Sequence, residues 1–547
     1  MVISRRRASR VLPVAIAGAA ALILLTGPTP ALGAGEGGGE EHPQPVDFTH
    51  NIRDTEAPVA GAVFGSGPQV KTGTAICTTP TQSTANANTD CDGPNPHNET
   101  SIAVNPTDPN NLVGGANDYQ LALNPGGHVS ETVLSRAHVT FDGGRTWSEY
   151  PVFSNSAYQG TGDPALAFDA AGNAYYGTLG FRFVGPTSAT NPDVLVSTSS
   201  DKGRTWTVAR VAEGSGSAGS VCDLLDKEYV AAWGNGNAIV TYGDFRLGQN
   251  GSFVSARIFA SVTHNAGRTW SAPRVISGTL DEAFVSVPTV AADGRIFVAF
   301  LNTTDLQTGR DDYEVVQVNP ATGAALTNPV KVATVIDGFD DYPIALGRQT
   351  YQDSIFRSWA AGNITADPTD ANHLAVVWSD MRNTTHPVDE DPYSAVTNSD
   401  VVVSQSVDGG QSWSAPTALT APGDQWMPWG AYDTNGLLRI GTFDRSADPA
   451  NHVYNYSLTT EAAHGSLGFG PLGPVTTTTS DPTRDNRWFA GTLDPAFPFA
   501  TSFLGDYSNI AATADGGVVA YWTDLRNEVT FAGRTGHGQD AYFAKQG

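Results

Sequence analysis

The stretch that decides the fold is "VTFDGGRTWS", Val139–Ser148, because closely related phrases return three more times along the chain. The other copies are "TSSDKGRTWT" (198–207), "VTHNAGRTWS" (262–271) and "QSVDGGQSWS" (405–414). Each phrase lies between two strand-like stretches and has the residues of a hairpin turn. Its acidic residue accepts hydrogen bonds from turn N–H groups, its glycine adopts a positive φ, and its tryptophan anchors the outgoing strand.

The acidic position of the phrase is held by Asp142, Asp201, Asn265 and Asp408. Asn265 keeps an acceptor oxygen but carries no charge, which indicates a structural role for the position and not a catalytic one. Each phrase belongs to a longer unit of four short strands, and seven such units follow one another after about residue 95. Stacked around an axis, such units form an all-β propeller with few exposed strand edges.

The seventh unit lacks an outer strand in this interpretation. A segment near Pro45–Arg53 or Gly67–Thr74 is expected to supply it and so to close the ring. Because the turn phrase occurs in only four units, six blades with an irregular extra segment are the alternative to seven.

The start of the chain has the pattern of an export signal. Residues 1–34 contain a basic stretch, an apolar core and a small-residue cleavage region. Residues 35–94 are predicted to be a flexible leader and a loop flanked by Cys77 and Cys91, and residues 95–547 the propeller. We therefore expect a secreted monomer that is not inserted in a membrane, in which these two cysteines form a disulfide.

The net charge of -25 disfavours binding to nucleic acid or to an anionic membrane surface. No cofactor is required by any motif. The acidic loops "DGFDDYP" (337–343) and "PVDEDPY" (387–393) have oxygen ligands for a structural calcium ion, but they lack the spacing of a known calcium loop. Solvated turns are the favoured interpretation of both.

The repeated turn phrases resemble the Asp boxes, or BNR repeats, of the sialidase superfamily. The resemblance covers nearly the whole chain after about residue 95 and implies a sialidase-like propeller. The resemblance also implies that three arginines bind a carboxylate of the substrate. It further implies a tyrosine nucleophile with a glutamate partner, and an aspartate that acts as the acid/base. Tyrosine is an exceptional nucleophile among glycosidases. Many propellers with such repeats have other activities or none.

Three second strands end in a related phrase: "YGDFR", "WSDMR" and "WTDLR". Arg246, Arg382 and Arg526 in these phrases are the candidates for a guanidinium cluster that binds a carboxylate. The alternative for each copy is an ion pair with the aspartate two residues earlier, which lies on the same side of the strand.

The other candidates lie near the loops that converge opposite the turn phrases. Tyr507 is the candidate nucleophile, and Glu99 and Glu228 are its candidate partners. Asp118, Asp163 and Asp506 are the acid/base candidates, and Trp359, Trp426 and Trp429 are candidates for stacking on a sugar. The chain departs from the family at the first inner strand, where "NETSIAV" replaces the usual Arg-Ile-Pro phrase.

The function predicted from these observations is that of a secreted, sialidase-like glycoside hydrolase that removes terminal sugars, including sialic acid, from glycans. Two alternatives stay open. One is a propeller that binds carbohydrate or protein without catalysis, and the other is a polysaccharide lyase or a different exo-glycosidase on the same scaffold.

Overall fold

The computed structural model describes residues 73–123, 129–152, 158–185, 188–189, 191–215, 222–248, 252–305, 308–345, 348–385, 391–486 and 501–547. The predicted signal peptide and most of the predicted leader lie outside these ranges. The described residues include no helix with the length and apolar character of a membrane span.

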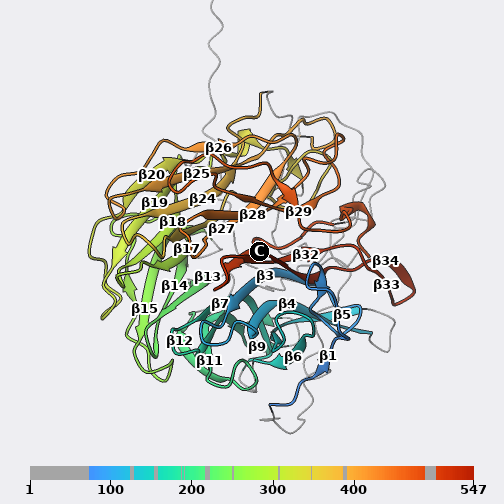
Figure 1. The fold of residues 1–547 in the computed structure, drawn as a ribbon, viewed down its shortest axis with the longest axis horizontal. Coiled ribbons are helices and arrows are strands. Elements are labelled where there is room, and N and C mark those ends of the chain that lie inside the picture. The colour runs from blue at the N-terminus through green and yellow to red at the C-terminus, as the bar shows by residue number, and fades with distance from the viewer. Residues whose placement is uncertain are drawn as a thin grey trace, which may run out of the picture.

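Seven antiparallel sheets surround a central channel, and the chain passes through them in order (Figure 1). This confirms the all-β propeller and the count of seven blades. From the channel outward the strands are, in blade one, β3 (His97–Val104), β4 (Leu112–Leu123), β5 (Val129–Thr140) and β6 (Ser148–Pro151); in blade two, β7 (Gly160–Phe168), β8 (Ala174–Phe181), β11 (Asp193–Ser199) and β12 (Thr207–Ala212); in blade three, β13 (Cys222–Trp233), β14 (Asn237–Leu247), β15 (Phe253–Thr263) and β16 (Arg274–Val275).

The other four blades repeat this order. They are β17 (Ala283–Val290), β18 (Ile296–Asp305), β19 (Arg310–Val318) and β20 (Val330–Thr334); β23 (Asn363–Ala366), β24 (Leu374–Asp380), β25 (Asp400–Ser406) and β26 (Thr417–Leu419); β27 (Gln425–Tyr432), β28 (Leu438–Asp444), β29 (Asn455–Thr460) and β30 (Gly473–Pro474); and β31 (Asn509–Ala512), β32 (Val518–Asp524) and β35 (Asp540–Gln546) with β2 (Ala87–Asn88) outermost.

Short elements decorate the loops. They are the hairpins β9 (Phe183–Gly185) with β10 (Ser188–Ala189), β21 (Ile344–Ala345) with β22 (Arg348–Gln349), and β33 (Glu528–Phe531) with β34 (Arg534–His537), and the 3-10 turns η3 (Phe339–Asp341) and η4 (Pro482–Arg484).

The ring is closed by residues that precede the first blade. β1 (Cys77–Thr78) pairs with β6 of blade one, and β2 pairs with β35 of blade seven. The Cys77–Cys91 disulfide joins the two ends of this segment. The outer strand of blade seven is therefore Ala87–Asn88 and not Gly67–Thr74, of which the described residues 73 and 74 belong to no strand; Pro45–Arg53 lies outside the described residues.

The four repeated turns work through the hydrogen bonds expected of them. Asp142 Oδ1 accepts from the backbone N–H groups of Arg145 (3.0 Å) and Thr146 (2.9 Å), and the indole Nε1 of Trp147 donates to Gly144 O (3.1 Å). Asn265 Oδ1 accepts from Thr269 N at 3.0 Å in the third copy. An acceptor oxygen is thus sufficient, and the negative charge is not needed for the turn.

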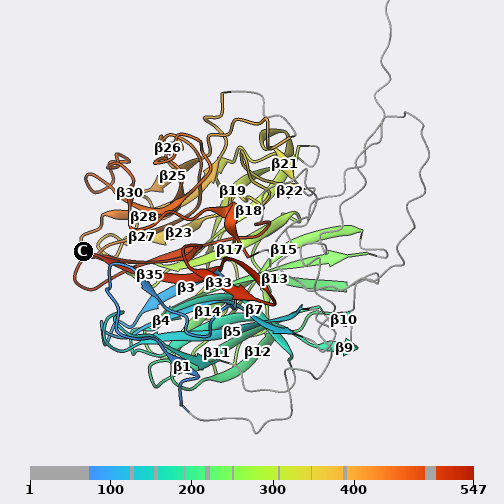
Figure 2. The same cartoon turned by 90° about the vertical axis from the view of Figure 1, so that its right-hand side faces the viewer.

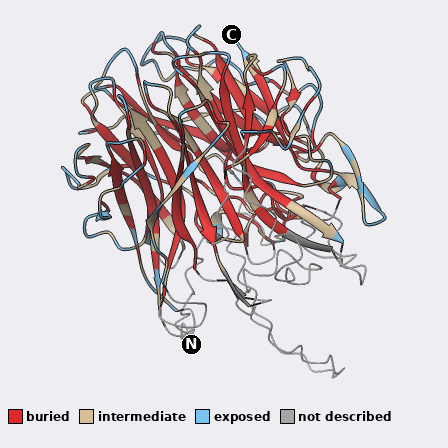
Figure 3. Cartoon of the chain, turned by 90° about the horizontal axis from the view of Figure 1, so that it is seen from below, coloured by how far each residue is buried: buried red, intermediate tan, exposed pale blue. Residues whose placement is uncertain are grey.

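The core lies between the blades. Strand interiors are buried, and the exposed residues that the structure describes lie mainly in turns (Figure 3). The two ends of the propeller carry different sets of loops (Figure 2). We call the end with the loops between second and third strands the channel face, and the end with the first-to-second and third-to-fourth turns the turn face.

Five of the seven inner strands contain a β-bulge that shapes the channel. The pairing register shifts after Asn98, Gly162, Asp226, Phe284 and Trp426. The residue at the bulge has a positive φ in all five strands, although none is glycine: Glu99 (54°), Asp163 (59°), Lys227 (53°), Val285 (50°) and Met427 (49°). Such conformations are strained for ordinary residues and concentrate at functional sites. Three neighbouring blades thus place charged residues at one equivalent position.

Candidate functional site

The bulge residues of the first three blades meet at one ammonium group. Lys227 Nζ lies 2.9 Å from Asp163 Oδ2, 3.3 Å from Glu99 Oε1 and 2.7 Å from Asp506 Oδ2. Its side chain is only 1% exposed. Burial disfavours the charged amine, but the three carboxylates outweigh burial and raise the pKa of Lys227 well above its usual value. We call these four residues the channel cluster.

Asn117 of β4 contacts the side chain of Glu99 and the backbone of Asp163, which come from neighbouring blades. Its Nδ2 donates to Glu99 Oε2 (2.8 Å), and its Oδ1 accepts from the backbone N–H of Asp163 (2.7 Å). Burial and the charge of Asp163 raise the pKa of Glu99 well above its usual value in spite of Lys227. Glu99 is therefore set up to hold a proton. Asp163 makes the closer contact with the ammonium group, at 2.9 Å compared with 3.3 Å for Glu99.

Asp506 has a different environment within the same cluster. Its carboxylate accepts from both Lys227 and Arg357, and the Arg357 Nε–Asp506 Oδ1 distance is 2.6 Å. Burial opposes ionisation, but these two cations outweigh it and hold the pKa of Asp506 well below its usual range. With its oxygens engaged in this way, Asp506 anchors Lys227 and is not suited to attack a substrate.

Aromatic side chains form the wall beside the cluster. Lys227 Nζ lies 5.7 Å from the ring centres of both Trp359 and Tyr507. Tyr229 packs against Tyr507 (centroids 5.5 Å apart) and stacks on Trp429 (5.8 Å). Trp359 and Trp429 are half-buried, as expected for residues at the margin of a binding site.

Tyr507 lies in this wall, but its phenol is poorly suited to act as a nucleophile or a base. Its Oη donates to Pro164 O at 3.0 Å. Burial, reinforced by the negative charges of Glu99 and Asp163, raises the pKa of Tyr507 well above its usual value. The ionised tyrosine that attack or proton abstraction needs is therefore strongly disfavoured.

A cleft of about 80 Å³ lies between the third and fourth blades, and Trp359 forms part of its wall. Phe245 and Phe284 add apolar surface, and three carboxyl groups line it: Glu282, Asp311 and Asp337. Burial raises the pKa values of Glu282 and Asp311 to about 7. Trp359 thus connects this cleft with the channel cluster.

Two other predicted site residues lie outside the channel cluster. Glu228, the residue after the bulge, lies against blade two, where its Cγ is 3.6 Å from the position that a Cβ on Gly177 would occupy. Burial and the charge of Asp163 raise its pKa well above the usual value. Trp426 is fully buried in the core, stacked on Phe443, and is therefore not available to a sugar.

The structure does not bring Arg246, Arg382 and Arg526 together in a carboxylate-binding cluster. Arg382 pairs with Asp380 through Nε (2.8 Å) and Nη2 (2.6 Å), and Arg526 pairs with Asp524 through Nε (2.8 Å) and Nη2 (2.7 Å). Arg246 is 57% exposed and lies 3.6 Å from Asp223.

In the second and third copies of this phrase, the aspartate also binds the tryptophan of the phrase. The indoles of Trp378 and Trp522 donate to Asp380 and Asp524, each at 2.9 Å. These two copies are therefore braces at the end of a second strand, as the alternative interpretation predicted, whereas Arg246 of the first copy lies 3.6 Å from Asp223.

Two of the three aspartates in the acidic loop at 337–343, Asp337 and Asp341, are engaged with protein groups. Asp341 accepts hydrogen bonds from Arg310 Nη2 (2.8 and 2.6 Å) and from Gly338 N (2.8 Å), and Asp337 Oδ1 accepts from Asp311 N at 3.1 Å. Most of the loop at 387–393 lies outside the described residues. In the first loop, the oxygens of these two aspartates therefore accept hydrogen bonds from protein groups.

Asp118 belongs to a second buried cluster, between blade one and the segment that closes the ring. Asp118 Oδ2 lies 3.0 Å from Arg136 Nε, and Asp118 Oδ1 lies 3.6 Å from His97 Nε2. Burial opposes protonation of His97, but Asp90, Asp118, Asp92 and Glu149 raise its pKa to about 10. His138 and Asp540 also interact electrostatically with His97, and Arg136 interacts electrostatically with Asp118. Burial raises the pKa of Asp118 to about 7.

This cluster makes stability depend on pH. A histidine whose pKa is raised by folding contributes its full stabilisation below its unfolded pKa of about 6.5 and loses it as the pH rises toward 10. Asp118 also makes stability fall as the pH rises. Its pKa is raised to about 7 in the folded protein, so the folded state holds a proton that it loses near pH 7. We expect the free energy of unfolding, measured by urea denaturation, to fall by at least about 1 kcal/mol between pH 6.5 and pH 9.5.

The matched control for this expectation is His97→Gln, which keeps a polar side chain but cannot take a proton. Its unfolding free energy should fall less steeply over the same pH interval. Equal slopes for the two proteins would show that His97 is not protonated in the folded state.

Sequence reasoning missed Lys227, Arg357 and Asn117. A signal for Lys227 was present, because aligning the inner strands puts it at the position of Glu99 and Asp163, one residue before Glu228. Arg357 lies in a long loop before β23. Asn117 lies inside a second strand, and no local pattern in the sequence distinguishes it.

No protein-family model matches the chain, and no curated protein matches it. Among solved structures, the chain is similar to the Hadza microbial sialidase Hz136 (12% identity, 76% of this chain and 75% of that one, TM-score 0.40) and to a PL25 ulvan lyase (10%, 69% and 96%, 0.40). It is also similar to the GH93 α-L-arabinofuranosidase of Fusarium graminearum (14%, 70% and 98%, 0.41). These neighbours are glycoside hydrolases and a polysaccharide lyase. The seven-bladed propeller described above fits the sialidase-like fold that the sequence repeats predicted.

Proposed function

We propose that the protein is a glycoside hydrolase whose catalytic pair is Glu99 and Asp163. The observation that carries the proposal is a pair of carboxyl groups from adjacent blades that share one ammonium group, of which Glu99 has a raised pKa. Glu99 has a raised pKa and acts as the general acid toward the glycosidic oxygen. Asp163, whose Oδ2 lies 2.9 Å from Lys227 Nζ, acts as the nucleophile.

The spacing of the pair favours a retaining mechanism. Glu99 and Asp163 contact the same nitrogen at 3.3 and 2.9 Å, so the two contacting oxygens are closer than the separation of about 6.5 Å or more that inverting enzymes use. Asp163 then attacks the anomeric carbon while Glu99 protonates the leaving oxygen. In the second step Glu99 takes a proton from water, and that water releases the sugar from Asp163.

The substrate class is a terminal sugar without a carboxylate. Arg382 and Arg526 are each engaged with an aspartate, which removes the guanidinium cluster on which the sialic acid hypothesis rested. Trp359, Trp429 and the cleft beside Trp359 provide aromatic surface for sugar rings. We also propose that the protein is exported and acts as a monomer on extracellular glycans.

A panel of 4-nitrophenyl glycosides and short oligosaccharides, with a sialoside included, tests the proposal. We expect the wild-type protein to hydrolyse at least one neutral glycoside and Asp163→Asn to lose that activity. Asp408→Asn is the matched control, because an asparagine already serves in the equivalent turn at Asn265. Turnover of the sialoside alone would restore the sialidase hypothesis, and no turnover by folded protein would favour a binding propeller.

A further inference from the structure

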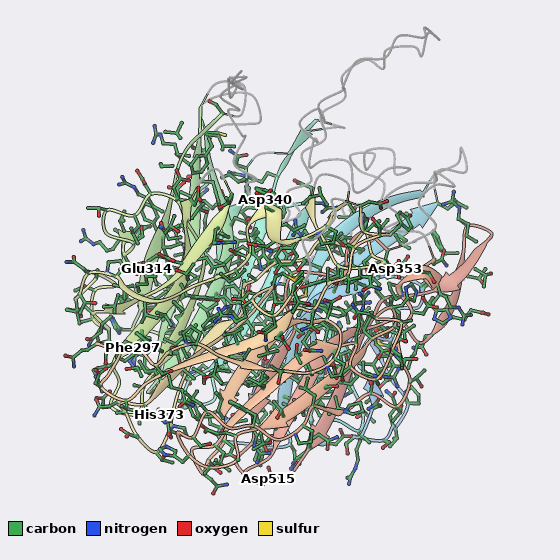
Figure 4. All side chains as sticks on the ribbon, turned by 90° about the horizontal axis from the view of Figure 1, so that it is seen from above. Phe297, Glu314, Asp340, Asp353, His373 and Asp515 are labelled. Atoms are coloured by element: carbon green, nitrogen blue, oxygen red, sulfur yellow. A yellow bond between two sulfur atoms is a disulfide. The ribbon has the colours of Figure 1, made fainter. Side chains whose placement is uncertain are left out.

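Two histidines and an aspartate meet on the turn face, at the end of the propeller opposite the channel cluster. Asp367 and His373 lie in the turn between β23 and β24 of blade five, and His464 lies in the turn between β29 and β30 of blade six. Figure 4 shows His373 on the opposite side of the molecule from Asp340, which belongs to the channel face.

The three side chains direct one atom each to a common point. Asp367 Oδ2 is 3.0 Å from His373 Nδ1 and 2.5 Å from His464 Nε2, and the two ring nitrogens are 3.2 Å apart. Donor atoms bound tetrahedrally to one zinc ion at about 2.0–2.2 Å lie roughly 3.3–3.6 Å from one another. The two ring nitrogens, 3.2 Å apart, already have nearly this spacing, and the Asp367 oxygen needs to move outward by about 1 Å or less to complete it.

Hydrogen bonds alone explain this arrangement less well. For both imidazoles to donate to Asp367 Oδ2, each nitrogen must carry a hydrogen, and two N–H groups would then face the same point 3.2 Å apart. A divalent cation removes this conflict, because it takes the lone pairs of both nitrogens and of the carboxylate oxygen.

The surrounding groups are placed as they are around known metal ligands. Asp367 Oδ1 accepts from Thr369 N and Thr369 Oγ1, both at 2.7 Å, which leaves Oδ2 for the ion. The other nitrogen of His373, Nε2, lies 3.3 Å from the hydroxyl oxygen of Tyr432. An outer hydrogen bond of this kind fixes the tautomer of a ligating histidine.

We propose that Asp367, His373 and His464 bind a divalent transition ion, most readily Zn²⁺, that joins blades five and six. Asp367 and His373 are buried, while the side chain of His464 is 47% exposed, so solvent reaches the remaining coordination positions. The ion links two turns that are far apart in the sequence. It adds a cross-link to the ring on the side away from the proposed catalytic pair and plays no part in the reaction proposed above.

The test is calorimetric titration of chelator-treated, dialysed protein with ZnCl₂. We expect the wild-type protein to take up one equivalent of zinc. His464→Ala should bind zinc at least about 100-fold more weakly and therefore not take up this equivalent. His264→Ala is the matched control, because His264 is an exposed histidine in the third-to-fourth turn of blade three. That variant should bind zinc like the wild type.

A second variant separates zinc binding from a general effect on folding. Tyr432→Phe should weaken zinc binding about 10-fold while circular dichroism shows an unchanged fold. Co²⁺ should give a visible absorption band with the wild type that is absent with His464→Ala. The proposal is overturned if the wild type takes up no more zinc than His464→Ala, or if His264→Ala loses the same equivalent.

Discussion

Replacing Glu99 by glutamine is expected to lower kcat/KM about 10³-fold on a glycoside with a poor leaving group. Glutamine preserves the shape of the side chain but cannot donate the proton that the departing oxygen needs. With a 2,4-dinitrophenyl glycoside the loss should be far smaller, because that leaving group departs without protonation. Steady-state kinetics on the two substrates measures the difference.

The dependence on the leaving group identifies the role of Glu99. Asp163→Asn should impair both substrates, because the attacking carboxylate is needed whatever the leaving group is. Asp408→Asn should impair neither. Equal losses on both substrates for Glu99→Gln would mean that Glu99 is not the general acid and only holds Lys227 in place.

The second large effect is on stability. Lys227→Met is expected to lower the free energy of unfolding by about 3–5 kcal/mol, because it leaves three buried carboxylates without their shared cation. The loss should be smaller at pH 5 than at pH 8, since protonation of Glu99 relieves part of the repulsion. Urea denaturation at the two pH values measures both quantities.

Lys202→Met is the matched control for this substitution. Lys202 is 45% exposed and forms one ion pair with Asp108 at 2.7 Å. Exposed pairs contribute about 1 kcal/mol or less, so this variant should unfold close to the wild type. If Lys227→Met were as stable as Lys202→Met, Lys227 would not be the charged centre of the channel.

The fold could be predicted from the sequence because its signals are local and repeated. The residues of the turn phrase at Val139–Ser148 form the hydrogen bonds that their types predict. The strands on either side either alternate apolar with polar residues or are wholly apolar. The outer strand of blade seven was placed wrongly. Ala87–Asn88 is only two residues long and pairs with β35 at the far end of the chain, so no local pattern marks it.

The site was predictable in part for the same reason. Glu99, Asp163, Asp506 and Tyr507 were expected near the loops of the channel face, and the structure brings them together around Lys227. The bulge displaces the register by one residue, so that Lys227 and not Glu228 enters the channel. Asp118 was misplaced because ring closure by a distant segment builds a second cluster around it.

The most direct measurement of the central claim is covalent trapping of the attacking residue. The protein is incubated with a 2-deoxy-2-fluoro glycoside of the best sugar from the panel and is examined by intact mass spectrometry and peptide mapping. We expect one sugar per protein, attached to the peptide that contains Asp163. A label on a residue outside the channel, or an unlabelled protein that releases a product of inverted configuration, would contradict the account.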